Sequence, residues 1–198
     1  RASFTFIDPT ATTQDLNGDT IPDLEVGQNF KIIWQKVGNI PNVKMEYSPG
    51  GNNFTTDTRP IEPTVDGIIA NSNAAGCGAS EGCYLWTVPD IEDNKDTNIK
   101  LRIRDPNDTG AETLSVNFYI IPKFTVGFPN GNTDINLTDK LKVGHRIGDT
   151  ATPYTITWTS SSSQARTPFV VLRYSTDGGG TWPAGKVITN TDNDGSYI

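Results

Sequence analysis

The sequence predicts an all-β protein built as two tandem β-sandwich domains. Apolar and polar residues alternate in several short runs, and no segment shows an apolar period of 3.6 residues, so strands are expected and helices are not. Turn-forming residues are frequent, with 19 glycines and 13 prolines among 198 residues. One strand–turn–strand module also occurs twice along the chain. Together these observations favour two small sandwiches over one large core.

The module repeats in the same order in both halves. Four segments of the first half have counterparts in the second: LEVG (24–27) and LKVG (141–144), FKIIW (30–34) and YTITW (154–158), VKMEYS (43–48) and VVLRYS (170–175), GCYL (82–85) and GSYI (195–198). We therefore predict one domain over residues 1–121 and a second over residues 122–198.

The second predicted domain is shorter than the first. The first has two further strands, at 99–104 and 113–120, and the second has no counterpart of either. A sandwich without its last two strands exposes an unpaired edge and half of its core. We therefore expect the second domain to be incomplete and the chain to be a piece of a longer protein. The missing strands would be cleaved off, disordered or supplied by another chain.

Each strand of the first domain is expected to bury one face. The predicted inward residues are Phe30, Ile32 and Trp34; Val43, Met45 and Tyr47; Tyr84 and Trp86; Ile99, Leu101 and Ile103; and Leu114, Val116, Phe118 and Ile120. Trp158 takes the place of Trp34 in the second domain. We interpret Trp34, Trp86 and Trp158 as core residues, with a sugar-stacking platform as the alternative.

The charge balance limits the partners that are expected. The net charge is -7 and the pI is about 4.6. An acidic surface argues against nucleic acid and anionic membranes as partners, and it leaves carboxylates free to hold cations. The sequence also has no apolar run long enough to span a bilayer.

The two cysteines, Cys77 and Cys83, lie among Gly76, Gly78 and Gly82. Glycines let the backbone close a small loop, so in an exported protein the pair is most simply a disulfide that clips a hairpin. Two free thiols are the alternative. A zinc site is not expected, because two cysteines and one distant histidine supply too few ligands.

The run DLNGDTIPD (15–23) has the spacing of a calcium loop. The expected oxygen ligands at positions 1, 3, 5, 7 and 9 are Asp15, Asn17, Asp19, the Ile21 carbonyl and Asp23. The run resembles the loops of dockerin, thrombospondin-type and integrin-propeller repeats, and this resemblance implies calcium as a cofactor. The alternative is an Asp/Asn-rich turn that caps its own backbone.

Two residues depart from that loop pattern. Thr20 stands where the family has glycine, at a sharp turn that is unfavourable for a β-branched residue, and Val26 takes the place of the closing glutamate. The equivalent loop of the second domain keeps oxygen side chains at three positions, Asn132, Asp134 and Asn136. Lys140 stands at the fourth. We therefore expect calcium in the first loop, and in the second either the Lys140 ammonium in its place or no site.

Residues 175–182, STDGGGTW, match the pattern S-x-D-x-G-x-T-W over its full length. They resemble the Asp-box of sialidases and other secreted β-proteins. Asp177 is expected to accept backbone N–H groups across the turn, and Trp182 to pack back onto the sheet. In that family the Asp-box is structural and lies away from the catalytic centre, so the resemblance does not imply sialidase activity.

The sequence shows no catalytic set, and we predict that the protein is not an enzyme. His145 is the single histidine, and no nucleophile motif accompanies it. The carboxylates of Asp90 and Glu92 lie in a polar loop and are interpreted as solvated charge. Three sequons are candidate glycosylation sites, with chance occurrence as the alternative: Asn53, Asn107 and Asn136.

Two segments, GCYLWTVPD (82–90) and YSTDGGGTW (174–182), resemble a widespread bacterial Ig-like repeat of secreted, cell-surface and surface-layer proteins. The resemblance implies an Ig-like β-sandwich for each domain and an extracellular, cell-surface location. It implies a structural module of a surface-layer or cell-surface matrix, in which copies of the chain self-associate and cell-wall or matrix glycan is a further partner. The alternative is an adhesin stalk or a carbohydrate-binding accessory module of a secreted hydrolase.

Overall fold

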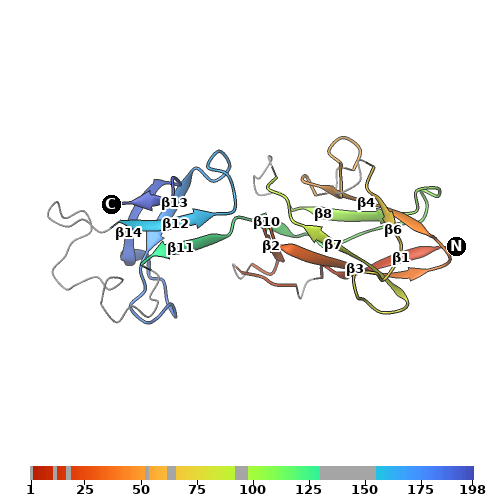
Figure 1. The fold of residues 1–198 in the computed structure, drawn as a ribbon, viewed down its shortest axis with the longest axis horizontal. Helices are drawn as coiled ribbons and strands as arrows, with labels where there is room; N and C mark the ends of the chain where they lie inside the picture. The colour runs from red at the N-terminus through yellow and green to blue at the C-terminus, as the bar shows by residue number, and fades with distance from the viewer. Residues whose placement is uncertain are drawn as a thin grey trace. The chain divides into compact units, whose positions relative to one another are not determined.

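The computed structural model describes residues 2–10, 13–16, 19–51, 54–61, 66–91, 98–129 and 155–198. Within these ranges the protein is all-β, as predicted, and its one helical segment is a 3-10 turn, η1 (Ala184–Lys186). This part of the chain therefore contains no helix that could cross a bilayer. The chain divides into two compact units, Arg1–Ile121 (unit 1) and Pro122–Ile198 (unit 2), which are described separately (Figure 1).

Unit 1 is built from two main sheets. Its described strands are β1 (Ser3–Asp8), β2 (Asp23–Glu25), β3 (Asn29–Val37), β4 (Asn42–Ser48), β5 (Arg59–Pro60), β6 (Ile68–Ala70), β7 (Glu81–Thr87), β8 (Lys100–Arg104), β9 (Glu112–Leu114) and β10 (Tyr119–Ile121). One sheet has the order β1-β3-β7, and the other has the order β5-β4-β8-β9 with β6 also on β4. β2 and β10 form a separate parallel ladder. This arrangement is consistent with a β-sandwich.

The residues that alternate inward on β3, β4 and β8 form the core of unit 1. Each is no more than 7% exposed: Phe30, Ile32, Trp34, Val43, Met45, Tyr47, Leu101 and Ile103. On β7, Trp86 packs edge-on against Phe118, with ring centroids 6.3 Å apart. The period-two prediction is thus confirmed for these strands, because their apolar faces meet in one cluster.

The prediction of one strand over residues 113–120 is wrong, because the run divides into β9 and β10 in different sheets. Ser115 lies at the division and is buried. Its backbone N–H donates to the Leu101 carbonyl, and its hydroxyl accepts from the Leu101 N–H (2.9 Å each) and donates to the Val116 carbonyl (2.7 Å). The four predicted inward residues therefore separate into an exposed pair, Leu114 and Val116, and a buried pair, Phe118 and Ile120.

Unit 2 repeats several pairings of unit 1. Its described strands are β11 (Phe124–Phe128), β12 (Ile156–Ser160), β13 (Phe169–Arg173), β14 (Val187–Asp192) and β15 (Ser196–Tyr197). β12 lies between β11 and β15, as β3 lies between β1 and β7, and β13 pairs with β14. β1 and β11 shift register at equivalent points, and each strand is followed by a cis proline peptide, Asp8–Pro9 and Phe128–Pro129.

A buried carboxylate stabilises the outer face of the second sheet in unit 1. Glu46 is 5% exposed and bonds Arg102 at 2.8 Å, Lys44 at 3.1 Å and Arg104 at 3.4 Å. The Arg102 guanidinium also lies 4.5 Å from the centroid of the Phe54 ring. Burial by itself raises the pKa of Glu46, but hydrogen bonds and charges from Arg102 and Lys44 outweigh it and hold the pKa below its ordinary value of 4.5.

Replacing this carboxylate with an amide, Glu46→Gln, is expected to lower the free energy of unfolding of unit 1 by about 2 kcal/mol at pH 7. A depressed pKa stabilises the fold above the unfolded-state value, and this stabilisation is lost as pH falls through the folded-state value. The difference between wild type and variant should therefore narrow below about pH 4.5. Urea titrations of the wild type and the variant at pH 7 and at pH 3 measure the stability loss and its decrease at low pH.

Glu112 provides the matched control for this substitution. It lies 3.9 Å from the same Arg102, but its side chain is 45% exposed. Glu112→Gln should change stability by less than about 0.5 kcal/mol. An equal deficit for Glu46→Gln at both pH values would contradict a role for the ionised carboxylate.

Candidate functional site

The loop before β2 holds the predicted calcium ligands. Its described residues are 13–16 and 19–23, so Asn17 lies outside the described residues. The Asp15 Oδ2 atom accepts a hydrogen bond from the Thr20 N–H, and the Asp19 Oδ1 atom accepts one from the Ile21 N–H, both at 2.8 Å. Asp15 and Asp19 are both exposed. These bonds curl the loop so that two carboxylates bind its own backbone.

Thr20 adopts the backbone conformation that the glycine of such loops supplies. Its φ is +74°, and it is the single described residue other than glycine with a positive φ. A β-branched residue in this region costs about 1–3 kcal/mol, so the rest of the loop must hold it there. Thr20 therefore forms this turn without a glycine.

Asp23 is the most unusual residue of the loop. It begins β2, lies opposite Tyr119 of β10 in the parallel ladder, and is 1% exposed. Its Oδ2 atom accepts a hydrogen bond from the Leu16 N–H at 2.8 Å. Its Oδ1 atom is also buried but accepts no hydrogen bond from any described residue. A buried carboxylate oxygen without a donor is costly, and a cation is one group that would satisfy it.

The described carboxylates of this loop do not form a metal-binding cluster. Within the described ranges, no three acidic, histidine or cysteine side chains lie close enough together to share a metal ion. The loop supplies hard oxygen atoms within a short segment, which is the donor chemistry that calcium prefers. The buried Asp23 oxygen is the feature of the described loop that such an ion would satisfy. Asn132, Asp134, Asn136 and Lys140, in the equivalent loop, lie outside the described residues.

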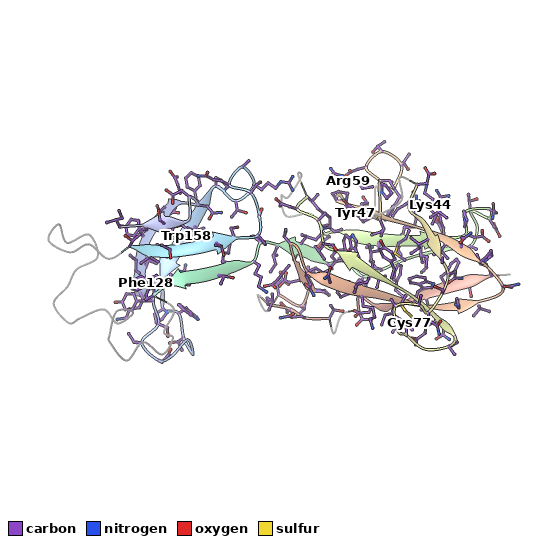
Figure 2. All side chains as sticks on the ribbon, viewed as in Figure 1. Lys44, Tyr47, Arg59, Cys77, Phe128 and Trp158 are labelled. Carbon is purple, nitrogen blue, oxygen red and sulfur yellow. A yellow bond between two sulfur atoms is a disulfide. The ribbon has the colours of Figure 1, made fainter. Side chains whose placement is uncertain are left out.

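The predicted disulfide joins Cys77, in the loop before β7, to Cys83 on β7 (Figure 2). This loop is an insertion relative to unit 2. Ten residues separate Asn71 from Gly82, whereas one residue separates the equivalent Asn193 from Gly195. The disulfide thus closes an extra loop of unit 1 that the repeat itself does not require.

The remaining predicted sites differ in their surroundings. Asn107 is exposed in the turn at 105–110, where its N–H donates to Asp105 Oδ1 at 2.8 Å, so its side chain is accessible to modification. Asn53, Asn136, Glu92 and His145 lie outside the described residues.

The Asp-box turn is closed by its own side chains. Asp177 accepts hydrogen bonds from the hydroxyls of Ser175 and Thr181 and from the Thr181 N–H. The hydroxyl bonds, first from Ser175 and then from Thr181, lower the pKa of this exposed carboxyl well below its usual range. All of these partners belong to the turn, so Asp177 acts as a turn residue, as predicted.

The four tryptophans divide into three buried and one exposed. Trp34, Trp86 and Trp158 are 0%, 2% and 6% exposed, which confirms them as core residues and leaves no ring face for a sugar. Trp182 was predicted to pack onto the sheet, but it is 55% exposed. Gly178 and Gly179, both with positive φ, shape the turn before it, and its partly covered indole lines a groove together with residues of β11, β12 and β13.

Two buried asparagines were missed by the sequence reasoning. In unit 1, the Asn71 Oδ1 atom accepts from the Trp34 Nε1–H at 3.0 Å, while its Nδ2 donates to the Ile40 carbonyl at 2.8 Å. In unit 2, Asn193 accepts from the Trp158 Nε1–H at 2.8 Å and donates to the Thr167 carbonyl at 2.9 Å. The repeat contains a signal that could have found them. Asn71 precedes Gly82 and Asn193 precedes Gly195, and these two glycines are equivalent in the repeat.

We call this arrangement the Trp–Asn clasp. Both asparagines also donate their backbone N–H to the carbonyl of a proline, Pro41 or Pro168, at 2.9 and 2.8 Å. Trp158 (Figure 2) lies on β12, which pairs with β11 and β15, as Trp34 lies on β3, which pairs with β1 and β7. The two units therefore share this clasp and the three-stranded sheet that carries it. No family model, no curated protein and no solved structure matches this chain.

Proposed function

We propose that this chain is a structural module of an extracellular assembly, of the surface-layer or cell-surface matrix type. The observation that carries the proposal is the repetition of the Trp–Asn clasp and its sheet in both units. Repeated small sandwiches span distance with few specialised side chains, which suits a mechanical role better than a catalytic one. The resemblance of GCYLWTVPD and YSTDGGGTW to bacterial Ig-like repeats points to the same function.

We assign both units to the Ig-like class as part of this proposal. In unit 1, a β1-β3-β7 sheet faces a sheet containing β4, β8 and β9, which parallels the two-sheet division of Ig-like sandwiches. The disulfide suits an oxidising compartment outside the cell. Surface glycosylation at Asn53, Asn107 or Asn136 belongs to this hypothesis, as does contact with cell-wall or matrix glycan.

Calcium is proposed to stabilise the loop before β2. Asp15, Asp19, Asp23 and the Ile21 carbonyl would hold it, together with Asn17. The support is the buried Asp23 oxygen that has no hydrogen-bond donor among the described residues. The ion would neutralise the buried charge and tie the loop to the β2–β10 ladder, and so stiffen unit 1.

Calcium is therefore expected to raise the stability of unit 1 and to promote self-association of the chain. At a concentration one hundred times its dissociation constant, a ligand adds about 2.7 kcal/mol. Asp23→Asn should abolish this gain, because the amide keeps one acceptor for the Leu16 N–H but lacks the second ligand oxygen. Without calcium the variant should be as stable as the wild type or more so, because it buries no charge.

Thermal unfolding and sedimentation velocity, each with and without calcium, measure these effects. Asp192→Asn, an exposed position at the end of β14, is the matched control and should leave the response intact. A variant that loses stability equally with and without calcium would show that Asp23 has a purely structural role. A chain that stays monomeric at all calcium concentrations would count against the assembly.

A carbohydrate-binding module is the second candidate function. The exposed Trp182 indole is the observation that favours it, since exposed aromatic rings stack on sugars. In a titration with cell-wall glycan, a change in tryptophan fluorescence that Trp182→Ala removes would support this alternative over the structural module.

A further inference from the structure

An apolar groove opens along one side of unit 2. It has a volume of about 470 Å³ and lies among the inner faces of β11 and β12, the edge of β13 and the Asp-box turn. The side chains that matter here are Phe124, Val126, Trp158, Val170, Leu172 and Trp182. Phe124 is 43% exposed and Val126 is 53% exposed. Side chains of this kind on a core-facing strand are normally covered.

Unit 1 shows what covers the equivalent surface. Phe4, the counterpart of Phe124, is 6% exposed, and Val43 and Met45, the counterparts of Val170 and Leu172, are fully buried. Phe4, Met45 and the inward Leu101 and Ile103 of β8 belong to one buried cluster, and β8 runs antiparallel to β4 with Ile103 opposite Met45.

The edge of β13 that would receive such a strand is open. β13 pairs with β14 in the register that β4 uses for β6, with Phe169 opposite Asp192 and Asn42 opposite Ala70. The other edge of β4 carries β8. Within residues 155–198 and the rest of the described chain, no strand pairs with the other edge of β13. An open edge beside an apolar groove is the geometry that accepts an added strand.

The charges on β13 define the partner further. Glu46 of β4, which binds Arg102 of β8, is replaced in unit 2 by the exposed Arg173. Lys44 is replaced by Val171. A strand with the charges of β8 would therefore place an arginine against an arginine. A strand with a carboxylate at that position would instead complement Arg173.

We propose that the groove of unit 2 binds an extended β-strand from outside residues 1–198. The strand runs antiparallel to β13, fills the groove with alternating apolar side chains and places a carboxylate opposite Arg173. It completes unit 2 as β8 completes unit 1. This inference rests on the internal repeat and does not depend on calcium or on the proposed function.

Two synthetic peptides added to the full chain test the proposal. One carries residues 98–105 as they stand, NIKLRIRD, and the other carries the same residues with Arg102→Glu. Both present the leucine and isoleucine of β8 to the groove and differ only in the residue opposite Arg173. The glutamate peptide should bind about fivefold more tightly, as measured by the fluorescence change of the groove tryptophans. In the chain variant Arg173→Glu, the preference should reverse.

Val126→Lys is the control for the groove itself. This side chain is already half-exposed, so the variant should fold, and it should bind neither peptide. Failure of both peptides to bind the wild-type chain would overturn the proposal. Peptide binding that persists in Val126→Lys would also overturn it, as would binding of the two peptides that does not depend on the charge of residue 173.

Sedimentation velocity, together with labelling of a cysteine placed at position 126, distinguishes the other possible occupants of the groove. A dimer that protects a Val126→Cys thiol would assign the groove to a second copy of this chain. Protection in a monomer would show that the groove is covered from within residues 1–198. Each of these results excludes the proposed partner strand, whereas a reactive thiol that the glutamate peptide protects supports it.

Discussion

Asn71→Ala is expected to lower the free energy of unfolding of unit 1 by about 3 kcal/mol. The substitution removes the acceptor of the buried Trp34 Nε1–H and the donor to the Ile40 carbonyl. Each buried polar group left without a partner costs about 1–3 kcal/mol, out of a typical total of about 5–15 kcal/mol. Urea unfolding followed by tryptophan fluorescence measures the loss. The transition of unit 1 is the one that a reducing agent shifts, because the disulfide belongs to that unit.

The variant Asn71→Asp separates the two hydrogen bonds of the clasp. Its carboxylate still accepts from Trp34 but cannot donate to Ile40, and its charge is buried where Asn71 is 8% exposed. The pKa of this new carboxyl should be raised in the folded state. The deficit is therefore largest at neutral pH and shrinks as pH falls through the raised value, because the protonated acid can donate again. A deficit that does not change with pH would contradict this assignment.

Asn193→Ala is the matched substitution in the other unit. It should destabilise unit 2 through the equivalent bonds to Trp158 and Thr167 and leave the transition of unit 1 in place. If either alanine variant lost less than about 1 kcal/mol, the clasp would be a by-product of the fold and not one of its main stabilising contacts.

Local pattern was sufficient to predict the all-β class and several of the buried strand faces. Alternation of apolar residues predicts the buried faces of β3, β4 and β8, because side chains on a strand point to opposite sides with a period of two. The spacing of Cys77 and Cys83 among glycines predicts a short closed loop for the same kind of local reason. The calcium hypothesis also rests on local spacing. The structure adds to it the buried Asp23 oxygen, which no sequence pattern could supply.

Contacts between distant segments could not be predicted in this way. Asn71 is a polar residue in an irregular stretch, and its role depends on a tryptophan that lies 37 residues before it. Glu46 alternates outward with its neighbours, yet it is buried and paired with cations of β4 and β8. Ser115 divides an apparently regular strand because its hydroxyl binds the backbone of β8. In each case a partner chosen by tertiary structure overrides the local preference.

Gly82→Ala is expected to destabilise unit 1 by about 3 kcal/mol, which lowers its melting temperature by about 10 °C. Gly82 lies opposite Trp34 in the β3–β7 ladder, and a Cβ atom at this position would overlap the indole ring. The backbone conformation of Gly82 is one that alanine can adopt, since its φ is not positive. The loss should therefore be steric, with the indole forced away from Asn71. Gly185→Ala, where no atom lies within 4 Å, is the control and should change stability by less than about 0.5 kcal/mol.

The steric origin can be separated from a backbone origin by comparing the two units. In the background of Trp34→Phe, whose ring is smaller, the added cost of Gly82→Ala should fall below about 1.5 kcal/mol, because the overlapping atoms are gone. Gly195 is the equivalent residue of unit 2, but its φ is +92°. Gly195→Ala should be destabilising for conformational reasons, and Trp158→Phe should not relieve it. The repeat would then use glycine at one position for two physical reasons, space in unit 1 and backbone conformation in unit 2. That distinction would be contradicted if the Trp→Phe substitution reduced the stability loss of both alanine variants, or of neither.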